Sequence, residues 1–206
     1  MNVFLYVIDT LADWEIGFLT AEINSGRYLK KNIEKPKIIK VGKNLKTVKT
    51  MGGLEITPDI SVKDIQANEG DLLLLGGADT WLTDENNDIL HFVKTNINSK
   101  IYIGAICGAT IALAQSGLLD DKKHTSNDLG FLKMTCPGYN GEKNYCNEPA
   151  VTDNNVITAT GIAPLDFSYA VLKKTGIMEK NTAEAWYQLY KTGQSNYFFA
   201  LMESIQ

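Results

Sequence analysis

The chain of 206 residues contains few of the side chains that build disulfide frameworks or metal sites: three Cys and two His. The cysteines are Cys107, Cys136 and Cys146, and they form neither a CxxC pair nor a metal-ligand spacing. We therefore expect a reduced, cytoplasmic protein without a bound metal or cofactor.

Long apolar runs and an excess of basic charge are also missing. No apolar run approaches the ~20 residues that span a bilayer, and residues 1–8 lack the basic start of a signal peptide. The formal net charge of −4 offers no basic patch for nucleic acid, and the lysines at positions 30, 31, 35 and 37 are expected on a solvated helix end and loop. We therefore expect neither nucleic acid nor a membrane among the partners of this protein. A length of 206 residues with 44% hydrophobic content predicts a single domain over residues 1–206.

Apolar runs and helical patterns alternate along the chain. Runs typical of buried parallel strands cover residues 3–8, 36–41, 71–75 and 101–105. Short strand pairs are expected around Gly52-Gly53 and Asn154-Asn155. Residues 120–150 show no clear pattern. Helices are expected over residues 13–29, from Asp84 or Asn87 to 96, from 108 to about 117, and over 164–174, 182–191 and 197–203. This alternation predicts a doubly wound α/β fold with a mostly parallel sheet.

Cys107 follows a buried strand directly and precedes a Gly and a helix of small residues. This order predicts a thiol on a tight strand-to-helix turn, where the unpaired N–H groups of the helix favour a thiolate. The same layout with Ser is the nucleophile elbow of hydrolases. A buried structural cysteine at the end of a core strand is the alternative.

Ligands of open parallel sheets bind at the carboxyl ends of the strands. Gly76 and Gly77 end one strand, and Cys107 and Gly108 end the next. Their N–H groups are candidate donors of an oxyanion hole, because no Cβ obstructs the approach. A simple glycine turn is the alternative.

Two further side chains, those of His124 and Glu15, are candidates for proton transfer or hydrogen bonding at the Cys107 thiol. His124 can return to the level of Cys107, because seven residues after Gly117 span up to ~23 Å; a surface histidine is the alternative. Glu15, in the first turns of the first helix, repels a thiolate if it is ionised and donates a hydrogen bond to it if it is protonated. An exposed carboxylate is the alternative for Glu15, and Asp13 beside it is expected to be an N-cap.

Five segments together resemble the ThiJ/PfpI family, of the class I glutamine amidotransferase-like superfamily: Asp13–Glu15, Gly76-Gly77, Ala105–Ala109, His124–Asn127 and Thr160–Pro164. The resemblance implies a flavodoxin-like three-layer α/β/α sandwich with a cysteine nucleophile elbow. It also implies Cys107 as nucleophile, Glu15 as its carboxyl partner, Gly77 and Gly108 as backbone donors, and a homodimer. Many protease-like members carry His directly after the cysteine, where this chain has Gly108. Asp128 is a weak candidate for a third triad member.

The leading hypothesis is a cysteine-dependent hydrolase, amidase or glyoxalase/deglycase-like enzyme for a small carbonyl or amide substrate. Cys107 would attack the carbonyl and His124 would move the proton. One alternative is a redox or stress-response protein in which Cys107 is oxidised without turnover. Another is a binding module that kept the fold.

Overall fold

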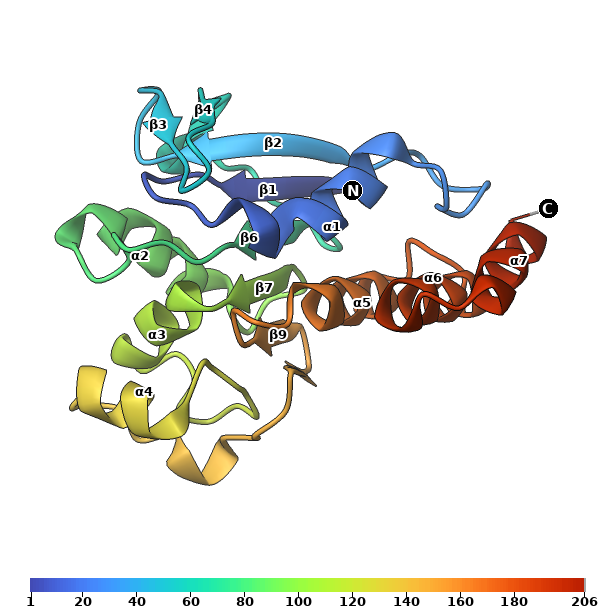
Figure 1. Cartoon of the computed structure of the whole chain (residues 1–206). Coiled ribbons are helices and arrows are strands. Elements are labelled where there is room, and N and C mark those ends of the chain that lie inside the picture. Colours follow the sequence, from blue (N-terminus) through green and yellow to red (C-terminus); the bar gives the residue numbers. More distant parts are fainter. Residues whose placement is uncertain (206) are drawn as a thin grey trace.

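The computed structural model describes residues 1–205. Its centre is a seven-stranded sheet in the order β5-β2-β1-β6-β7-β9-β8 (Figure 1). Neighbouring strands run parallel except for β8, which pairs antiparallel with β9. The strands are β1 (Asn2–Tyr6), β2 (Lys37–Gly42), β5 (Ile60–Ser61), β6 (Leu72–Leu75), β7 (Tyr102–Ile106), β8 (Ala150–Asp153) and β9 (Val156–Ala159). Two short strands, β3 (Val48–Lys49) and β4 (Glu55–Ile56), form a separate hairpin.

Helices cover both faces of the sheet, because each central strand is apolar on both sides. Successive residues of β1 alternate between the two layers: Val3 and Leu5 pack on the side of α1 and α5, and Phe4 and Tyr6 pack on the side of α2 and α3. The helices are α1 (Asp13–Ser25), α2 (Asn87–Asn96), α3 (Gly108–Gln115), α4 (Leu129–Thr135), α5 (Pro164–Thr175), α6 (Lys180–Thr192) and α7 (Ser195–Ser204). The predicted three-layer α/β/α sandwich is confirmed.

The order of the strands reverses between β1 and β6, which places the crevice at the carboxyl ends of these strands. The loop after β1, the Gly76-Gly77 segment after β6 and the turn after β7 all open there. The sheet therefore brings together the three strand ends on which the predicted site depends.

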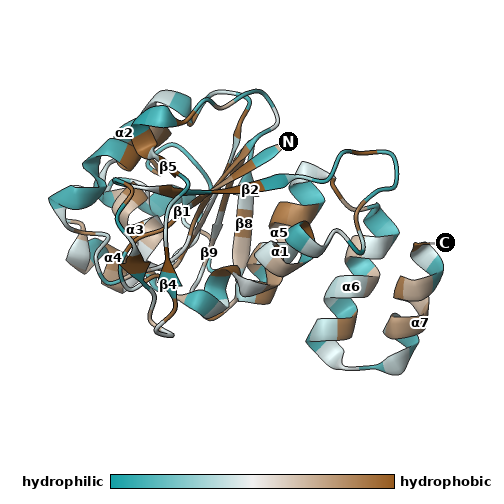
Figure 2. Cartoon of the chain, turned by 90° about the horizontal axis from the view of Figure 1, so that it is seen from above, coloured by the Kyte–Doolittle hydropathy of each residue, from teal (hydrophilic) through white to brown (hydrophobic). Residues whose placement is uncertain are grey.

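Two segments add to or differ from the expectations. The first helix ends at Ser25, before residue 29, because Gly26 adopts φ 71° and its N–H caps the carbonyl of Glu22. Residues 120–150 contain α4 and one short 3-10 helix, Glu142–Asn144, and a β-bridge between His124 and Tyr145 joins two parts of the segment. At the C-terminus the two expected helices are present as α6 and α7, which form a hairpin that projects from the end of the sandwich (Figure 2). Within residues 1–205 no helix is long and apolar enough to cross a membrane.

Candidate active site

Cys107 lies on a strained turn between β7 and α3. Its φ of 59° and ψ of −124° are unusual for a residue with a side chain. The surrounding chain holds this conformation: the Cys107 N–H donates to the carbonyl of Ala159 at 3.0 Å, and the Cys107 carbonyl accepts from the amide of Thr110 at 3.0 Å. Strain of this kind concentrates at functional sites. The turn therefore has the geometry of a nucleophile elbow.

Two glycines pack directly on the cysteine. A Cβ on Gly77 would lie 2.8 Å from the Cys107 Cβ and 2.5 Å from Oε2 of Glu15. A Cβ on Gly161, which follows β9, would lie 2.7 Å from the Cys107 sulfur and 3.0 Å from Oε1 of Glu15. No side chain fits at either position without displacing the thiol or the carboxyl.

Glu15 is buried, with 1% of its surface exposed, and its carboxyl lies beside Cys107. Oε2 accepts the Gly77 N–H at 2.6 Å. The other oxygen, Oε1, has no hydrogen-bond partner among residues 1–205. Burial raises the pKa of Glu15, and this rise is only partly offset by the Cys107 thiol and the Gly77 N–H. The predicted pairing of an acid with the thiol is present in the geometry.

The side chain that hydrogen-bonds the sulfur is Asn127, whose Nδ2 donates to Sγ at 3.3 Å. The orientation of this amide follows from its other contacts. Its Oδ1 accepts the Gly161 N–H at 2.8 Å, so Oδ1 must face Gly161 and the NH₂ group must face Cys107. Asn127 can therefore donate to an anionic sulfur but cannot remove its proton.

The pKa of Cys107 is raised to about 11, chiefly by burial and further by the negative charge of Glu15. The Asn127 amide and the Gly108 N–H act in the opposite direction. With Glu15 ionised, the site therefore favours the neutral thiol over a thiolate. A protonated Glu15 would remove the repulsion and add a donor.

His124 is fully buried, and both of its ring nitrogens are hydrogen-bonded away from Cys107. Nδ1 lies 2.6 Å from the Lys122 carbonyl and Nε2 lies 2.6 Å from the Tyr139 hydroxyl. Because a carbonyl only accepts, Nδ1 carries the hydrogen and Nε2 accepts from Tyr139. Burial also lowers the pKa of His124. The His124 ring is thus neutral and links the Lys122 carbonyl to the Tyr139 hydroxyl. It does not take the position of a base at the Cys107 thiol, which the sequence predicts for it.

Some of the glycines and acids predicted for the site have partners other than those expected. The Gly77 N–H is used by Glu15, so this amide positions the carboxyl and is not a free oxyanion donor. The Gly76 carbonyl accepts from the Trp81 indole at 2.7 Å. Gly108 begins α3 beside the sulfur, as expected. Asp128 caps α4 by accepting the Phe131 N–H at 2.7 Å, which accounts for its carboxylate without a triad.

Asp13 was expected to cap the first helix, but Ala12 occupies that position and has no side-chain cap. The carboxylate of Asp13 instead accepts the Gly52 N–H at 2.6 Å. This contact ties the tip of the β3–β4 hairpin to the start of α1, close to Glu15.

Together these features describe a flavodoxin-like α/β protein with a cysteine elbow and a buried carboxyl partner. Comparison with protein-family models matches residues 1–174 to the DJ-1/PfpI family. The chain belongs to this family, as the resemblance predicted.

Similar proteins agree with this assignment. "Uncharacterized protease YoaZ" of Bacillus subtilis is 47% identical, covering 99% of this chain and 97% of that protein. A solved thiJ/pfpI family protein from Bacillus anthracis is 48% identical with a TM-score of 0.97, covering 100% of this chain and 98% of that one. "Glutathione-independent glyoxalase DJR-1.2" of Caenorhabditis elegans is 29% identical, covering 60% of this chain and 64% of that protein.

Asn127 and Gly161 are not among the residues that the sequence predicts for the site. Both lie in segments that carry the family resemblance, and this was the available signal. Neither residue type marks reactive chemistry, and their contacts with Cys107 depend on three distant segments of the chain.

Proposed function

We propose that this protein is a cysteine-dependent enzyme that acts on a small carbonyl or amide substrate through Cys107, as a hydrolase, amidase or glyoxalase/deglycase. The observation that carries the proposal is the buried Glu15 carboxyl beside a thiol on a strained elbow. Buried acid pairs of this kind are costly to maintain, and they concentrate at functional sites. The names of the curated relatives, two proteases and a glyoxalase, agree with this class of chemistry.

In this proposal Glu15 accepts the proton of the Cys107 thiol, which is the role that the sequence predicts for His124. Burial raises the pKa of both groups, and the negative charge of Glu15 raises the pKa of Cys107 further. The proposal assigns one proton to this coupled pair, and it resides on the thiol before the attack. The sulfur attacks the carbonyl carbon, the π electrons of the C=O bond move to the oxygen, and the thiol proton moves to Oε1. A bond from sulfur to carbon forms while the S–H bond breaks.

The developing oxyanion needs hydrogen-bond donors. The Gly108 N–H at the start of α3 and the Asn127 amide lie at the sulfur and are suited to this role. Asn127 thus takes the donor role that the sequence predicts for Gly77.

The proposal is tested with Cys107→Ala and Glu15→Gln against two substrate classes, 2-oxoaldehydes such as methylglyoxal and fluorogenic peptide amides. We expect both variants to lose turnover of whichever substrate the native protein accepts, while circular dichroism shows an intact fold. Full turnover by Cys107→Ala would overturn the mechanism. Activity retained in Glu15→Gln would remove Glu15 as the proton acceptor.

A redox function is the second candidate, because the groups around the sulfur include donors that suit an anion. Asn127 and Gly108 donate, and a protonated Glu15 would add a third donor. An oxidised sulfinate would use all of them. Mass spectrometry after mild peroxide treatment tests this function: stable oxidation confined to Cys107, without turnover of any substrate, supports it. Equal oxidation of Cys136 and Cys146 contradicts it.

A homodimer, a cytoplasmic location and a single domain over residues 1–206 also belong to the proposal. Two large apolar side chains flank the site in exposed positions, Trp14 next to Glu15 at 54% exposed and Ile162 next to Gly161 at 93% exposed. A second copy covering them would shield the thiol from water. Light scattering coupled to gel filtration tests the dimer, and Ile162→Glu should weaken it.

A further inference from the structure

The basic residues of this acidic protein are concentrated in one segment. Nine of the 20 Lys and Arg residues, but one of the 24 Asp and Glu residues, lie at positions 27–49. The rest of the chain is strongly acidic in compensation. The basic segment contains β2, which lies near one edge of the sheet.

Half of β2 has no neighbouring strand on its outer side. On the inner side β2 pairs with β1 from Lys37 to Val41, whereas β5 pairs only with Val41 and Gly42. Lys37 donates to Met1 and Val41 accepts from Val7, so the odd-numbered residues bond inward. By the alternation of a strand, Ile38 and Lys40 direct their N–H and C=O groups outward.

Asp59 forms hydrogen bonds with both outward backbone groups of Lys40. Its carboxylate accepts the Lys40 N–H at 2.8 Å, and its own N–H donates to the Lys40 carbonyl at 2.8 Å. The outward N–H and C=O of Ile38 have no such partner within residues 1–205. One donor and one acceptor thus stay open for an incoming strand.

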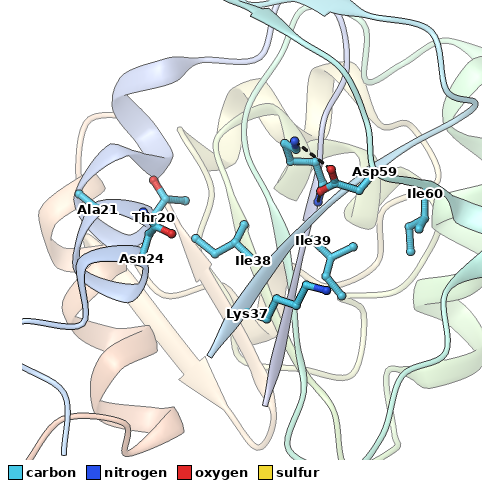
Figure 3. Close-up of a pocket in the computed structure, with 9 residues that line it drawn as sticks. Thr20, Ala21, Asn24, Lys37, Ile38, Ile39, Asp59 and Ile60 are labelled. Atoms are coloured by element: carbon cyan, nitrogen blue, oxygen red, sulfur yellow. Dashed lines mark hydrogen bonds and ion pairs between the residues drawn. The ribbon is translucent and has the colours of Figure 1, made fainter. Parts of the chain in front are cut away.

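The open edge borders a hollow of about 920 Å³ between α1 and β2. Figure 3 shows Ile38 directed toward α1, where Thr20, Ala21 and Asn24 form the opposite wall. Ile39 and Ile60 add apolar surface on the other side. An extended segment paired with Ile38 would find apolar contacts for side chains on both of its faces.

The charges at this hollow are mostly positive. Lys40 forms an ion pair with Asp59 at 2.9 Å. Lys37 is exposed, forms no ion pair within the described part of the chain, and helps to lower the pKa of Asp59. Lys35 reaches the carbonyl of Asn24 at one end of the hollow. Two lysines that line the hollow, Lys37 and Lys40, therefore accompany a single carboxylate, and Lys35 adds a third positive charge at its end.

We propose that the open edge of β2 is a docking site for an extended acidic segment of a partner protein, which adds a strand to the sheet at Ile38. Main-chain hydrogen bonds would supply affinity, and Lys35 and Lys37 would select acidic side chains. A second copy of this edge is disfavoured, because pairing two copies would bring their lysines together. Nucleic acid is disfavoured, because it makes no use of an open strand or an apolar floor.

The test uses nitrogen-15 NMR titration of the full-length protein with the blocked peptide Ser-Glu-Val-Val-Glu-Ser, which mirrors the order Lys-Ile-Ile-Lys of β2. We expect shifts at the Ile38 amide and its neighbours in β2. The matched peptide with Lys in place of Glu should bind at least about fivefold more weakly.

Two N-methylated versions of the acidic peptide separate strand pairing from simple charge attraction. In a paired strand one valine N–H faces Ile38 and the other faces away. Methylation of the first should weaken binding at least about fivefold, and methylation of the second should not. Equal affinity of both methylated peptides overturns the strand pairing.

Variants of the protein complete the test. Lys37→Glu should weaken binding of the acidic peptide about fivefold. Lys143→Glu is the same change at an exposed lysine outside the hollow, and it should leave binding unchanged. Ile38→Pro removes the outward N–H without removing a bond to β1, and it should abolish the shifts.

Three outcomes overturn the proposal: absence of shifts at β2, equal effects of Lys37→Glu and Lys143→Glu, or displacement of the peptide by a single-stranded oligonucleotide at equal concentration. Loss of a dimer in Lys37→Glu, measured by light scattering, would assign the edge to a second copy instead. Because none of the readouts uses Cys107, failure here is distinguishable from failure of the proposed function.

Discussion

The packing of Gly161 on Cys107 makes a single added methyl group a sensitive test of the site. In Gly161→Ala the new Cβ would lie 2.7 Å from Sγ and 2.9 Å from Cβ of Cys107, well inside normal contact distance. Neither side can yield easily: Asn127 holds the Gly161 N–H at 2.8 Å, and Ala159 holds the Cys107 N–H at 3.0 Å. Overpacking of this kind costs about 2 kcal/mol, which lowers the Tm of a chain of this length by about 4–8 °C.

The assay combines thermal unfolding with the rate of Cys107 alkylation by iodoacetamide. We expect Gly161→Ala to lower the Tm and to change the alkylation rate at least about threefold, because the sulfur must leave the Asn127 amide. Gly138→Ala is the matched control, since no atom lies within 4 Å of its added Cβ. Equal Tm values and equal alkylation rates in the two variants would refute the close packing of Gly161, Cys107 and Glu15.

Three further predictions address the charges of the site. Asn127→Asp should raise the pKa of Cys107 above about 11, because a negative charge replaces a donor; the pH profile of alkylation measures it, with Asn147→Asp as control. Glu15→Gln should increase the free energy of unfolding at pH 7 but not near pH 4. The raised pKa of Glu15 stabilises the fold only while the carboxyl is protonated, and this contribution is lost as the pH rises. For His124 the sign is opposite. Its pKa is lowered by burial, so stability is lost as the pH falls from about 6.5 toward the lower pKa of the folded state, and urea titrations of His124→Gln should lack this loss.

The elbow could be predicted from the sequence because every signal for it is local. The chain passes directly from an apolar run to Cys107, Gly108 and a stretch of small residues. This order is typical of a buried strand, a tight turn and a helix in succession. Glu15 could be named because the start of the first helix lies at the same edge of the sheet. These residues depend only on the order of strands and helices.

His124 and Asn127 could not be assigned in the same way, because chain length gives only an upper limit to reach. The loop that carries them is placed by long-range contacts: Thr125 donates to the Thr158 hydroxyl at 2.9 Å, and the Ser126 and Thr110 hydroxyls lie 2.7 Å apart. These contacts turn Asn127 toward the sulfur and leave His124 in the interior. Such long-range pairings leave no periodic pattern in the sequence of the loop, so they cannot be predicted from it.

The burial of Glu15 and the strain at Cys107 have a common consequence. Both lower the free energy of unfolding. A Gln in place of Glu15 would avoid the buried charge, and a glycine in place of Cys107 would avoid the backbone strain. The costs fall on adjacent atoms, and Gly77 and Gly161 leave no space through which either group could relax. A structural cysteine would need neither the strain nor the charge, since it is buried most cheaply among apolar neighbours, as Cys136 is, with 1% of its surface exposed. The site is therefore better explained by the reactivity of the sulfur than by its packing.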